Sequence, residues 1–339
     1  AFRLEKRHAN SQCITMSSAK KDSSLSQSNN TSGSYETLTF SAKEDVPPII
    51  LGVLIVLVNG LVLILVLKKK HLRTITNLLL CSLALSDLMT GLASIPLFMA
   101  CSILHQSGLC ISADQMLRFT SVSAVCHLLV ISVDRYLAII HSLRYKSIVT
   151  LLRYLSVVLF IWILSAVIAL IQLSWIDLGS HNVYEEATAE LIRKEIIYDS
   201  VSLVIFFFTP LVCMAFVYSK IFFEVSRQIN NIRRESYPGW QKVEEMKNAE
   251  RKVLSIFAVM LMVYTVCWLP YFILRFIFND GDLHPHVAHI STWLRFLTSF
   301  LNPCLYILGK KDFRKALSRR RSRDKRCQIF LADPLERSG

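Results

Sequence analysis

The chain has 339 residues, of which 53% are hydrophobic and only 19% are charged. Soluble domains are rarely so apolar, and stretches of about 20 apolar residues, which suffice to cross a bilayer, recur along the sequence. The net charge of +13 lies mostly between these stretches. We therefore expect contact with anionic membrane lipid and no nucleic-acid partner.

Seven apolar segments predict seven membrane-spanning helices. In chain order they cover residues 46–67, 75–101, 111–140, 155–175, 196–223, 253–278 and 287–308. The predicted fold class is an all-α membrane protein with a seven-transmembrane helix bundle and a short amphipathic eighth helix near 311–321. We divide the chain into a disordered extracellular N-terminal tail (1–45), a seven-transmembrane domain (46–309), and the amphipathic helix with a basic cytoplasmic tail (310–339).

Lys and Arg cluster after the first, third, fifth and seventh segments, as at 68–70 and 310–326. Such clusters remain on the cytoplasmic side of a membrane. We therefore expect a multi-pass protein of the plasma membrane, with the N-terminus extracellular and the C-terminus cytoplasmic. Overlapping sequons at Asn29 and Asn30 predict glycosylation of the outer tail.

Four polar side chains interrupt the apolar segments: Asn59, Asp87, Ser299 and Asn302. An ionised carboxylate at membrane depth is costly unless it is paired or hydrated, so Asp87 needs partners. One interpretation is a water-filled cluster that can hold a cation such as sodium. The other is a packing network whose hydrogen bonds are satisfied.

Two further features of the sequence are unfavourable for helices in a membrane. Asp134-Arg135-Tyr136 places charges where the third segment ends, and Pro270 and Pro303 interrupt the sixth and seventh segments. A Pro inside a helix removes a backbone hydrogen bond. Residues that are locally unfavourable in this way tend to mark functional sites of a protein.

These features belong to a series that runs through the segments in order. The series is Asn59, Leu83-Ala84-Leu85-Ser86-Asp87, Cys110, Asp134-Arg135-Tyr136, Trp162, Pro210 with Tyr218, Cys267-Trp268-Leu269-Pro270, Asn302-Pro303 with Tyr306, and Phe313. With this series the chain resembles a rhodopsin-like (class A) G-protein-coupled receptor over nearly all of residues 46–320. The resemblance implies a receptor, not an enzyme, that binds an extracellular ligand within the bundle and activates heterotrimeric G-proteins.

The resemblance also implies roles for individual residues. Arg135 is held at rest by Asp134 and by Glu250 at the foot of the sixth helix, and it meets the G-protein when it is freed. Pro270 bends that helix, so a small shift at Trp268 becomes a larger swing at its foot. The remaining switch and coupling residues are Tyr136, Leu143, Tyr218, Asn302, Pro303 and Tyr306, with Asn59, Asp87 and Ser299 as the ion and water cluster.

The chain departs from the family pattern in its cysteines. Family members usually bond the residue at Cys110 to a Cys in the second outer loop, but residues 176–195 contain none. Cys110 is therefore free, or bonded to Cys101 or to Cys13. The short Cys101–Cys110 loop is compatible with a disulfide.

Other departures bear on the ligand. Leu117 stands where amine receptors of this family carry an Asp, which disfavours biogenic amines. The segment 287–308 has no Lys, which disfavours retinal as a ligand. The expected pocket is largely apolar and suits a lipid, a small amphiphile or an acidic ligand. Its residues are Phe98, Leu117, Arg118, Ser121, Ser202, Tyr271, Phe272, Arg275, Thr292 and Phe296.

Three Arg residues, Arg118, Arg275 and Arg295, lie near the outer halves of segments. Buried Arg is expensive, so each requires a partner. They either grip a carboxylate or phosphate of an acidic ligand, or pair with Asp114, Asp199 or lipid head groups. A channel or transporter that uses the buried polar residues as a permeation path is the alternative function. No metal site is expected beyond a sodium ion at Asp87.

Overall fold

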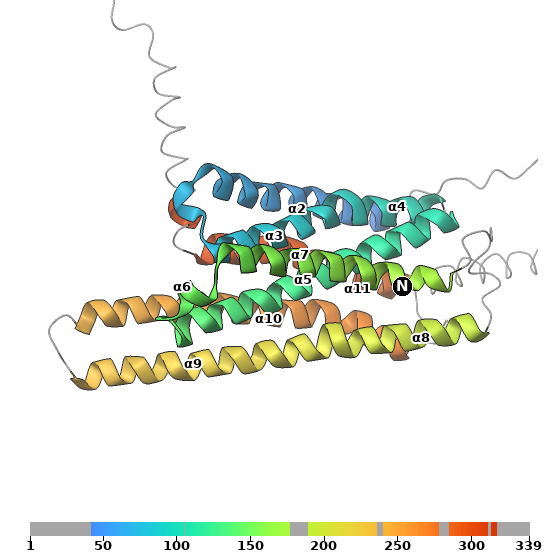
Figure 1. Ribbon diagram of the computed structural model, residues 1–339. Coiled ribbons are helices and arrows are strands. Elements are labelled where there is room, and N and C mark those ends of the chain that lie inside the picture. Colours follow the sequence, from blue (N-terminus) through green and yellow to red (C-terminus); the bar gives the residue numbers. More distant parts are fainter. Residues whose placement is uncertain are drawn as a thin grey trace, which may run out of the picture.

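The computed structural model describes residues 42–104, 106–176, 189–235, 240–277, 285–310 and 313–316. The predicted glycosylation sites Asn29 and Asn30, and Cys13, lie outside the described residues, as do the side chains of Glu250 and Arg275. Every regular element in the described ranges is a helix. The helices run side by side as an elongated bundle (Figure 1), as the sequence predicts.

Seven long helical segments, here called rods, make up the bundle, and short elements connect them. The first three rods are α2 (Ala42–Lys68), the sequence α3 (Ile75–Met89), η2 (Thr90–Ser94) and α4 (Ile95–Leu104), and α5 (Ser107–Ile140). The fourth and fifth are α7 (Leu151–Leu170) with η3 (Ile171–Ser174), and α8 (Ala189–Leu203), η4 (Val204–Phe208) and α9 (Thr209–Glu235). The last two are α10 (Trp240–Ile277) and α11 (Pro285–Gly309), and the short connecting elements are η1 (Lys70–Leu72) and α6 (Tyr145–Ile148).

The helix starts follow local sequence rules. The Thr74 side chain accepts a hydrogen bond from the backbone N–H of Asn77 at the start of α3, and Thr150 accepts one from Arg153 at the start of α7. Each cap satisfies a backbone donor that the first turn leaves unpaired. The two rods that follow these caps therefore begin where the sequence supplies a hydroxyl.

The fifth and sixth rods are longer than the sequence analysis predicts. The predicted apolar segments cover 196–223 and 253–278, but α9 continues to Glu235 and α10 begins at Trp240. The extension is amphipathic: Ile221, Val225 and Ile229 are spaced four residues apart and are buried. This spacing places them on one helix face, so the helix continues past the end of the apolar segment at 223.

Five of the rods pack in series, and the third rod, α5, joins the two ends of the series. The pairs of the series are α2 with α3, α11 with α2, α10 with α11, and α9 with α10. The third rod, α5, packs against α3, α4, α7 and α9. Because α5 touches three other rods, the second, fourth and fifth, its side chains contribute to both ends of the bundle.

Close approach of α2 and η2 requires a small residue at Gly91. A Cβ built there would lie 2.9 Å from Val56 Cγ2 and 3.1 Å from the backbone oxygen of Gly52. Neither neighbour can give way easily because both belong to the packed face of α2. Gly91 therefore allows the first and second rods to touch along a π-helical turn.

The outer surface of the bundle is apolar. Five described helices are long and apolar enough to cross a membrane, and α10 contains a shorter apolar segment, Ala258–Leu274. Large apolar side chains point outward on several rods, among them Leu57, Leu159, Phe160, Val212, Phe216, Met262 and Val266. Exposure on this scale is unfavourable in water and suits lipid, so the fold is that of a multi-pass membrane protein.

Candidate functional site

A cavity opens between the third, fifth, sixth and seventh rods. It encloses about 650 Å³ of space free of protein atoms, its open mouth included. Part of its wall comes from α8, which lies at the same end of the bundle as α4 (Figure 1). The lining residues are Asp114, Leu117, Arg118, Ser121, Val122, Val125, Ile168, Tyr198, Asp199, Ser202, Phe206, Tyr264, Trp268, Tyr271, Phe272 and Arg295.

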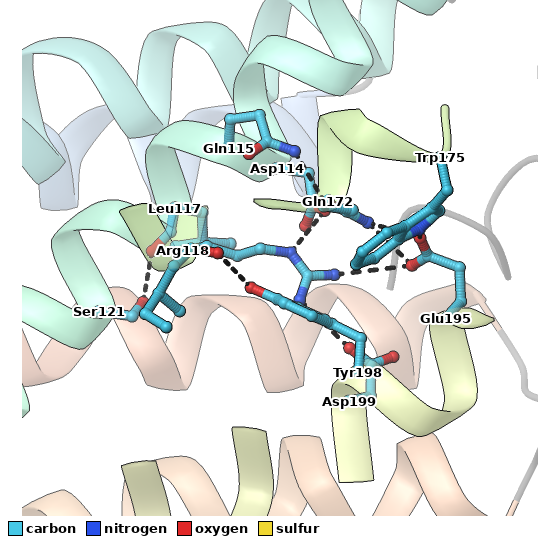
Figure 2. Close-up of polar contacts among 11 residues, drawn as sticks. Asp114, Gln115, Leu117, Arg118, Ser121, Gln172, Trp175, Glu195, Tyr198 and Asp199 are labelled. Carbon is cyan, nitrogen blue, oxygen red and sulfur yellow. Dashed lines mark hydrogen bonds and ion pairs between the residues drawn. The ribbon is translucent and has the colours of Figure 1, made fainter. Parts of the chain in front are cut away.

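Arg118 is held at the cavity wall by acidic side chains. Its Nε donates to Asp114 Oδ2 at 2.8 Å, and its Nη1 to Asp199 Oδ1 at 3.2 Å. Glu195 Oε2 lies 4.0 Å from Nη2, and the guanidinium carbon lies 4.7 Å from the centre of the Tyr198 ring. Arg118 is thus neutralised within the protein, as Figure 2 shows.

The same acids anchor a wider polar network. Glu195, only 8% exposed, accepts two hydrogen bonds from Gln172 Nε2, at 2.9 and 2.8 Å, and one from Trp175 Nε1 at 2.8 Å. Gln115 donates to Gln172 Oε1 at 2.7 Å. The network joins α5, η3 and α8 at the mouth of the cavity (Figure 2).

A disulfide closes the turn between α4 and α5. It joins Cys101 to Cys110, whose Cα atoms are 4.8 Å apart, and both residues are buried. Of the alternatives that the sequence leaves open for Cys110, the structure has the short bridge. The third rod is therefore tied to the second rod.

Aromatic side chains of α10 form one wall of the cavity. Trp268 lies 5.6 Å from the ring of Tyr264 and 6.2 Å from that of Phe272, centre to centre. Tyr264 also donates its hydroxyl proton to the backbone oxygen of Phe206 at 3.1 Å. Phe206 lies in η4, a π-helical turn, so the tyrosine joins the sixth rod to an irregular point of the fifth.

Arg295 of α11 is the second cation of the cavity. It is 7% exposed, and its guanidinium carbon lies 3.8 Å from the centre of the Tyr271 ring and 5.8 Å from that of Trp268. Nη2 donates to Thr292 Oγ1 at 3.4 Å, and Nε has no hydrogen-bond partner. Within the described residues, no carboxylate forms an ion pair with it.

The cavity contains six of the ten residues that the sequence analysis assigns to the pocket: Leu117, Arg118, Ser121, Ser202, Tyr271 and Phe272. Phe98, Thr292 and Phe296 do not line it. The rings of Phe98 and Phe296 instead meet at 5.8 Å in an apolar cluster that also contains Leu117, and Thr292 is buried beside Arg295. The Arg275 side chain lies outside the described residues.

Several lining residues are absent from the predicted pocket, among them Asp114, Tyr198, Asp199, Phe206 and Tyr264. Asp114 and Asp199 are predicted only as possible partners of the arginines. For two of these residues, Asp114 and Asp199, the spacing in the sequence indicates that they belong to the pocket. Asp114 precedes Arg118 by four residues, and Asp199 precedes Ser202 by three. Positions three or four apart share a helix face, so each acid faces the same space as its predicted neighbour.

Asp87 lies in the core of the bundle beside Ser299 and Asn302. It is 1% exposed, yet neither of its carboxylate oxygens has a hydrogen-bond partner among the described residues. Asn59 instead donates to the backbone oxygens of Ser299, at 2.9 Å, and of Ile55, at 3.0 Å. The structure thus brings the predicted cluster of Asn59, Asp87, Ser299 and Asn302 together in the core.

At the end of the bundle opposite the cavity, the Asp134 carboxylate accepts four hydrogen bonds. Its Oδ2 accepts from Thr76 Oγ1 at 2.7 Å and from Arg135 Nε at 3.1 Å and Nη2 at 2.5 Å. Its Oδ1 accepts from the Tyr145 hydroxyl at 2.7 Å. Arg135 is thereby held against α3 and α6. Burial, and then the bond to Asp134, raise the pKa of Tyr145 to about 12, so the phenol remains a donor near neutral pH.

The other predicted switch residues surround this cluster or extend from it. The Tyr218 hydroxyl lies 2.6 Å from Ser132 Oγ of α5, and Tyr306 is fully buried with its ring 5.9 Å from that of Phe313. Leu143 is 99% exposed. The Tyr136 ring meets His141 at 6.0 Å. Pro270 and Pro303 lie inside α10 and α11.

The bundle thus has a cavity lined by α5, α8 and α10 and, elsewhere, a restrained pair of Asp134 and Arg135. Residues 58–306 match the model of the family described as 7 transmembrane receptor (rhodopsin family). The chain belongs to this family, whose members couple to G-proteins. Membership identifies a receptor rather than an enzyme, and nothing favours the channel or transporter alternative.

The chain is also similar to curated receptors that are named for different ligands. The chain is 29% identical to Probable G-protein coupled receptor No18 of Amphibalanus amphitrite, covering 77% of this chain and 85% of the relative. It is 29% identical to the Histamine H2 receptor of Cavia porcellus (79% and 76%) and 26% identical to the Adenosine receptor A3 of Ovis aries (85% and 90%). Relatives named for an amine and for a nucleoside are about equally similar, so similarity does not select a ligand.

Proposed function

We propose that this protein is a plasma-membrane receptor that binds a small amphiphilic or acidic extracellular ligand in the cavity beside Trp268. Ligand binding opens the opposite face of the bundle to a heterotrimeric G-protein. The observation that carries this proposal is the position of the cavity: it borders Trp268, and Trp268 lies two residues before Pro270 within α10. A ligand in the cavity therefore acts directly on the helix that the Pro makes deformable.

The character of the lining supports this ligand class. Most lining side chains are aromatic or aliphatic, with hydroxyls at Ser121 and Ser202 and guanidinium groups at Arg118 and Arg295. Such a cavity takes an apolar body with one or two polar groups. An amine receptor would need a free acid at the wall, whereas Asp114 is engaged by Arg118 and Leu117 occupies the expected acid position.

The cytoplasmic role is proposed for the end that contains Asp134 and Arg135. In the described structure Arg135 contacts Asp134 and Thr76, which restrains it within the bundle. Exposed Leu143 provides an apolar contact for the G-protein on the same side. Activation frees Arg135, and the open bundle then catalyses GDP release on its partner. This assignment places the N-terminus outside the cell and the C-terminus in the cytoplasm.

The buried Asp87 cluster fits a sodium ion, because a carboxylate without hydrogen-bond partners and nearby amide and hydroxyl oxygens are the ligands that hard cations take. We propose that Asp87 holds the ion with help from Ser299 and Asn302. A bound cation would offset the cost of the buried charge. Lipid partners are proposed for the apolar outer surface and the basic tail.

Basal coupling to a panel of G-proteins tests the function. The full chain, Arg135→Ala and Asp87→Asn are expressed in cells, and surface levels are matched. We expect coupling to one G-protein class that Arg135→Ala abolishes. Coupling that survives Arg135→Ala at equal surface expression would refute the proposed role of the Asp-Arg pair.

A further inference from the structure

The two cations of the cavity differ in how well the protein compensates them. Arg118 has ion pairs to Asp114 and Asp199, at 2.8 and 3.2 Å, and a third acid, Glu195, at 4.0 Å. Among the described residues, Arg295 has a 3.4 Å hydrogen bond to Thr292, a polar contact with the Tyr271 side chain, and the faces of Tyr271 and Trp268, but no ion pair. It is nevertheless more than nine-tenths buried.

A buried guanidinium needs more hydrogen-bond acceptors than Arg295 has here. It carries five N–H donors in a fixed fork that matches a carboxylate or phosphate, and Nε of Arg295 is buried without any partner. Stacking on aromatic faces recovers part of the lost hydration but satisfies none of the donors. Asp114 and Arg118 are close enough to act on Arg295 electrostatically, but they are paired with each other and their charges largely cancel.

We infer that Arg295 is the anion-recognising residue of this receptor, and that Arg118 is a structural cation whose charge is already balanced. This inference rests on the proposed function and specifies its ligand class: an amphiphile whose carboxylate or phosphate completes the coordination of Arg295. Its apolar part lies among Leu117, Val122 and Phe272, which line the same cavity.

The position of Arg295 links recognition to the switch. The guanidinium stacks over Tyr271 and faces Trp268, both of which belong to α10. An anion that draws the guanidinium toward itself changes the packing of these two rings. The charged end of the ligand therefore acts on the sixth rod beside Pro270, and the apolar end supplies most of the buried contact.

Thermal unfolding of the purified full chain tests the inference with three probes of one shape: phenylbutyrate, phenylbutyramide and phenylbutylamine. We expect the carboxylate to raise the melting temperature at concentrations about tenfold lower than the amide, the ratio that one charge-assisted contact supplies. Arg295→Gln should abolish that preference, and Arg295→Lys should retain part of it. Arg153→Gln, an exposed Arg at the other end of the bundle, is the control that should retain all of it.

The unliganded variants give a second readout. Because Arg295 is poorly compensated, Arg295→Gln should melt at or above the temperature of the native receptor, whereas Arg118→Gln should melt well below it. Equal stabilisation by carboxylate and amide, or a preference that persists in Arg295→Gln, overturns the inference. So does a loss of stability in Arg295→Gln as large as that in Arg118→Gln.

Coupling measured on the same samples separates this inference from the proposed function. A receptor that activates a G-protein but does not prefer the carboxylate refutes the role of Arg295 alone. A chain that prefers the carboxylate through Arg295 but couples to no G-protein refutes the proposed function and leaves the site intact.

Discussion

Arg118 of α5 and Asp199 of α8 form an ion pair of 3.2 Å across the mouth of the cavity. The side chains are 16% and 9% exposed, so the pair is largely shielded from water. It joins the third and fifth rods, which the second outer loop cannot do through a disulfide because that loop has no Cys between 176 and 195. At this end of the bundle, an ion pair therefore connects two helices, and the second outer loop has no Cys for a disulfide that could do so.

We expect Asp199→Asn to destabilise the receptor by about 1–3 kcal/mol, since a partly buried guanidinium would lose one of its two close carboxylates. Thermal unfolding in detergent measures the change. Lys194→Gln is the matched control, because Lys194 and Glu190 form an ion pair on the same helix with both side chains well exposed, and such pairs contribute little. Equal effects of the two substitutions would contradict a structural role for the Arg118 pair.

Breaking the disulfide should destabilise the same end of the bundle. For Cys101→Ser with Cys110→Ser we expect a loss of about 2–4 kcal/mol, typical of a short native bridge, and a lower melting temperature that reducing agent no longer changes. Cys213→Ser, at an exposed free cysteine, should leave the melting temperature as it is. Full stability of the double variant would show that the polar network alone holds the third rod.

Tyr145→Phe should raise basal coupling several-fold. The substitution removes one of the four donor contacts of Asp134 and so weakens the restraint on Arg135; a lost bond to a charged group is worth about 1.5–3 kcal/mol. The measurement is nucleotide exchange on the G-protein at matched surface expression. Ser147→Ala is the control, because the Ser147 hydroxyl bonds only to the local backbone of Arg144. Unchanged basal exchange would place Tyr145 outside the restraint.

Tyr264→Phe should also favour the active arrangement, by a different route. It removes the hydroxyl that donates to the Phe206 backbone oxygen, and thereby loosens α10 from η4 while the aromatic packing with Trp268 remains. We expect a measurable increase in basal coupling with little change in melting temperature. Thr265→Val is the neighbouring control, since the Thr265 hydroxyl bonds within its own helix, to Leu261.

Sodium should stabilise the receptor through Asp87. We expect the melting temperature to rise with sodium chloride and to rise less with potassium chloride or choline chloride at equal ionic strength. In Asp87→Asn the difference among the salts should disappear, because the neutral amide no longer favours a cation. A sodium effect that persists in Asp87→Asn would place the ion elsewhere.

The sequence predicts much of the architecture and of the switch. Length and polarity of the apolar segments require a membrane bundle, because every backbone group must be satisfied within the segment. Motif order places Asp134, Arg135, Trp268 and Asn302 in their rods. These conclusions depend on local sequence and on the bilayer, so no tertiary contact is needed to reach them.

The predicted pocket is less complete because a pocket is made between helices. Phe98 and Phe296 are apolar and correctly assigned to their rods, but they pack against each other, in a cluster with Leu117, and do not line the cavity. Asp114 and Asp199 lie 85 positions apart in the sequence, and only the packing of α8 beside α5 brings both to one guanidinium. The relative rotation of two helices about their axes is decided by side-chain packing over their full length, and no local pattern encodes it.

The sequence by itself therefore determined the class of molecule and the helical, membrane-spanning character of its segments. Only the tertiary structure decided which cysteine bridges to Cys110, and which of two cavity arginines is balanced by acids. The physical reason is that hydrophobic length and backbone satisfaction act within one helix. Charge compensation, in contrast, depends on distances of a few ångströms between helices, where Arg118 meets two carboxylates and Arg295 meets two aromatic rings.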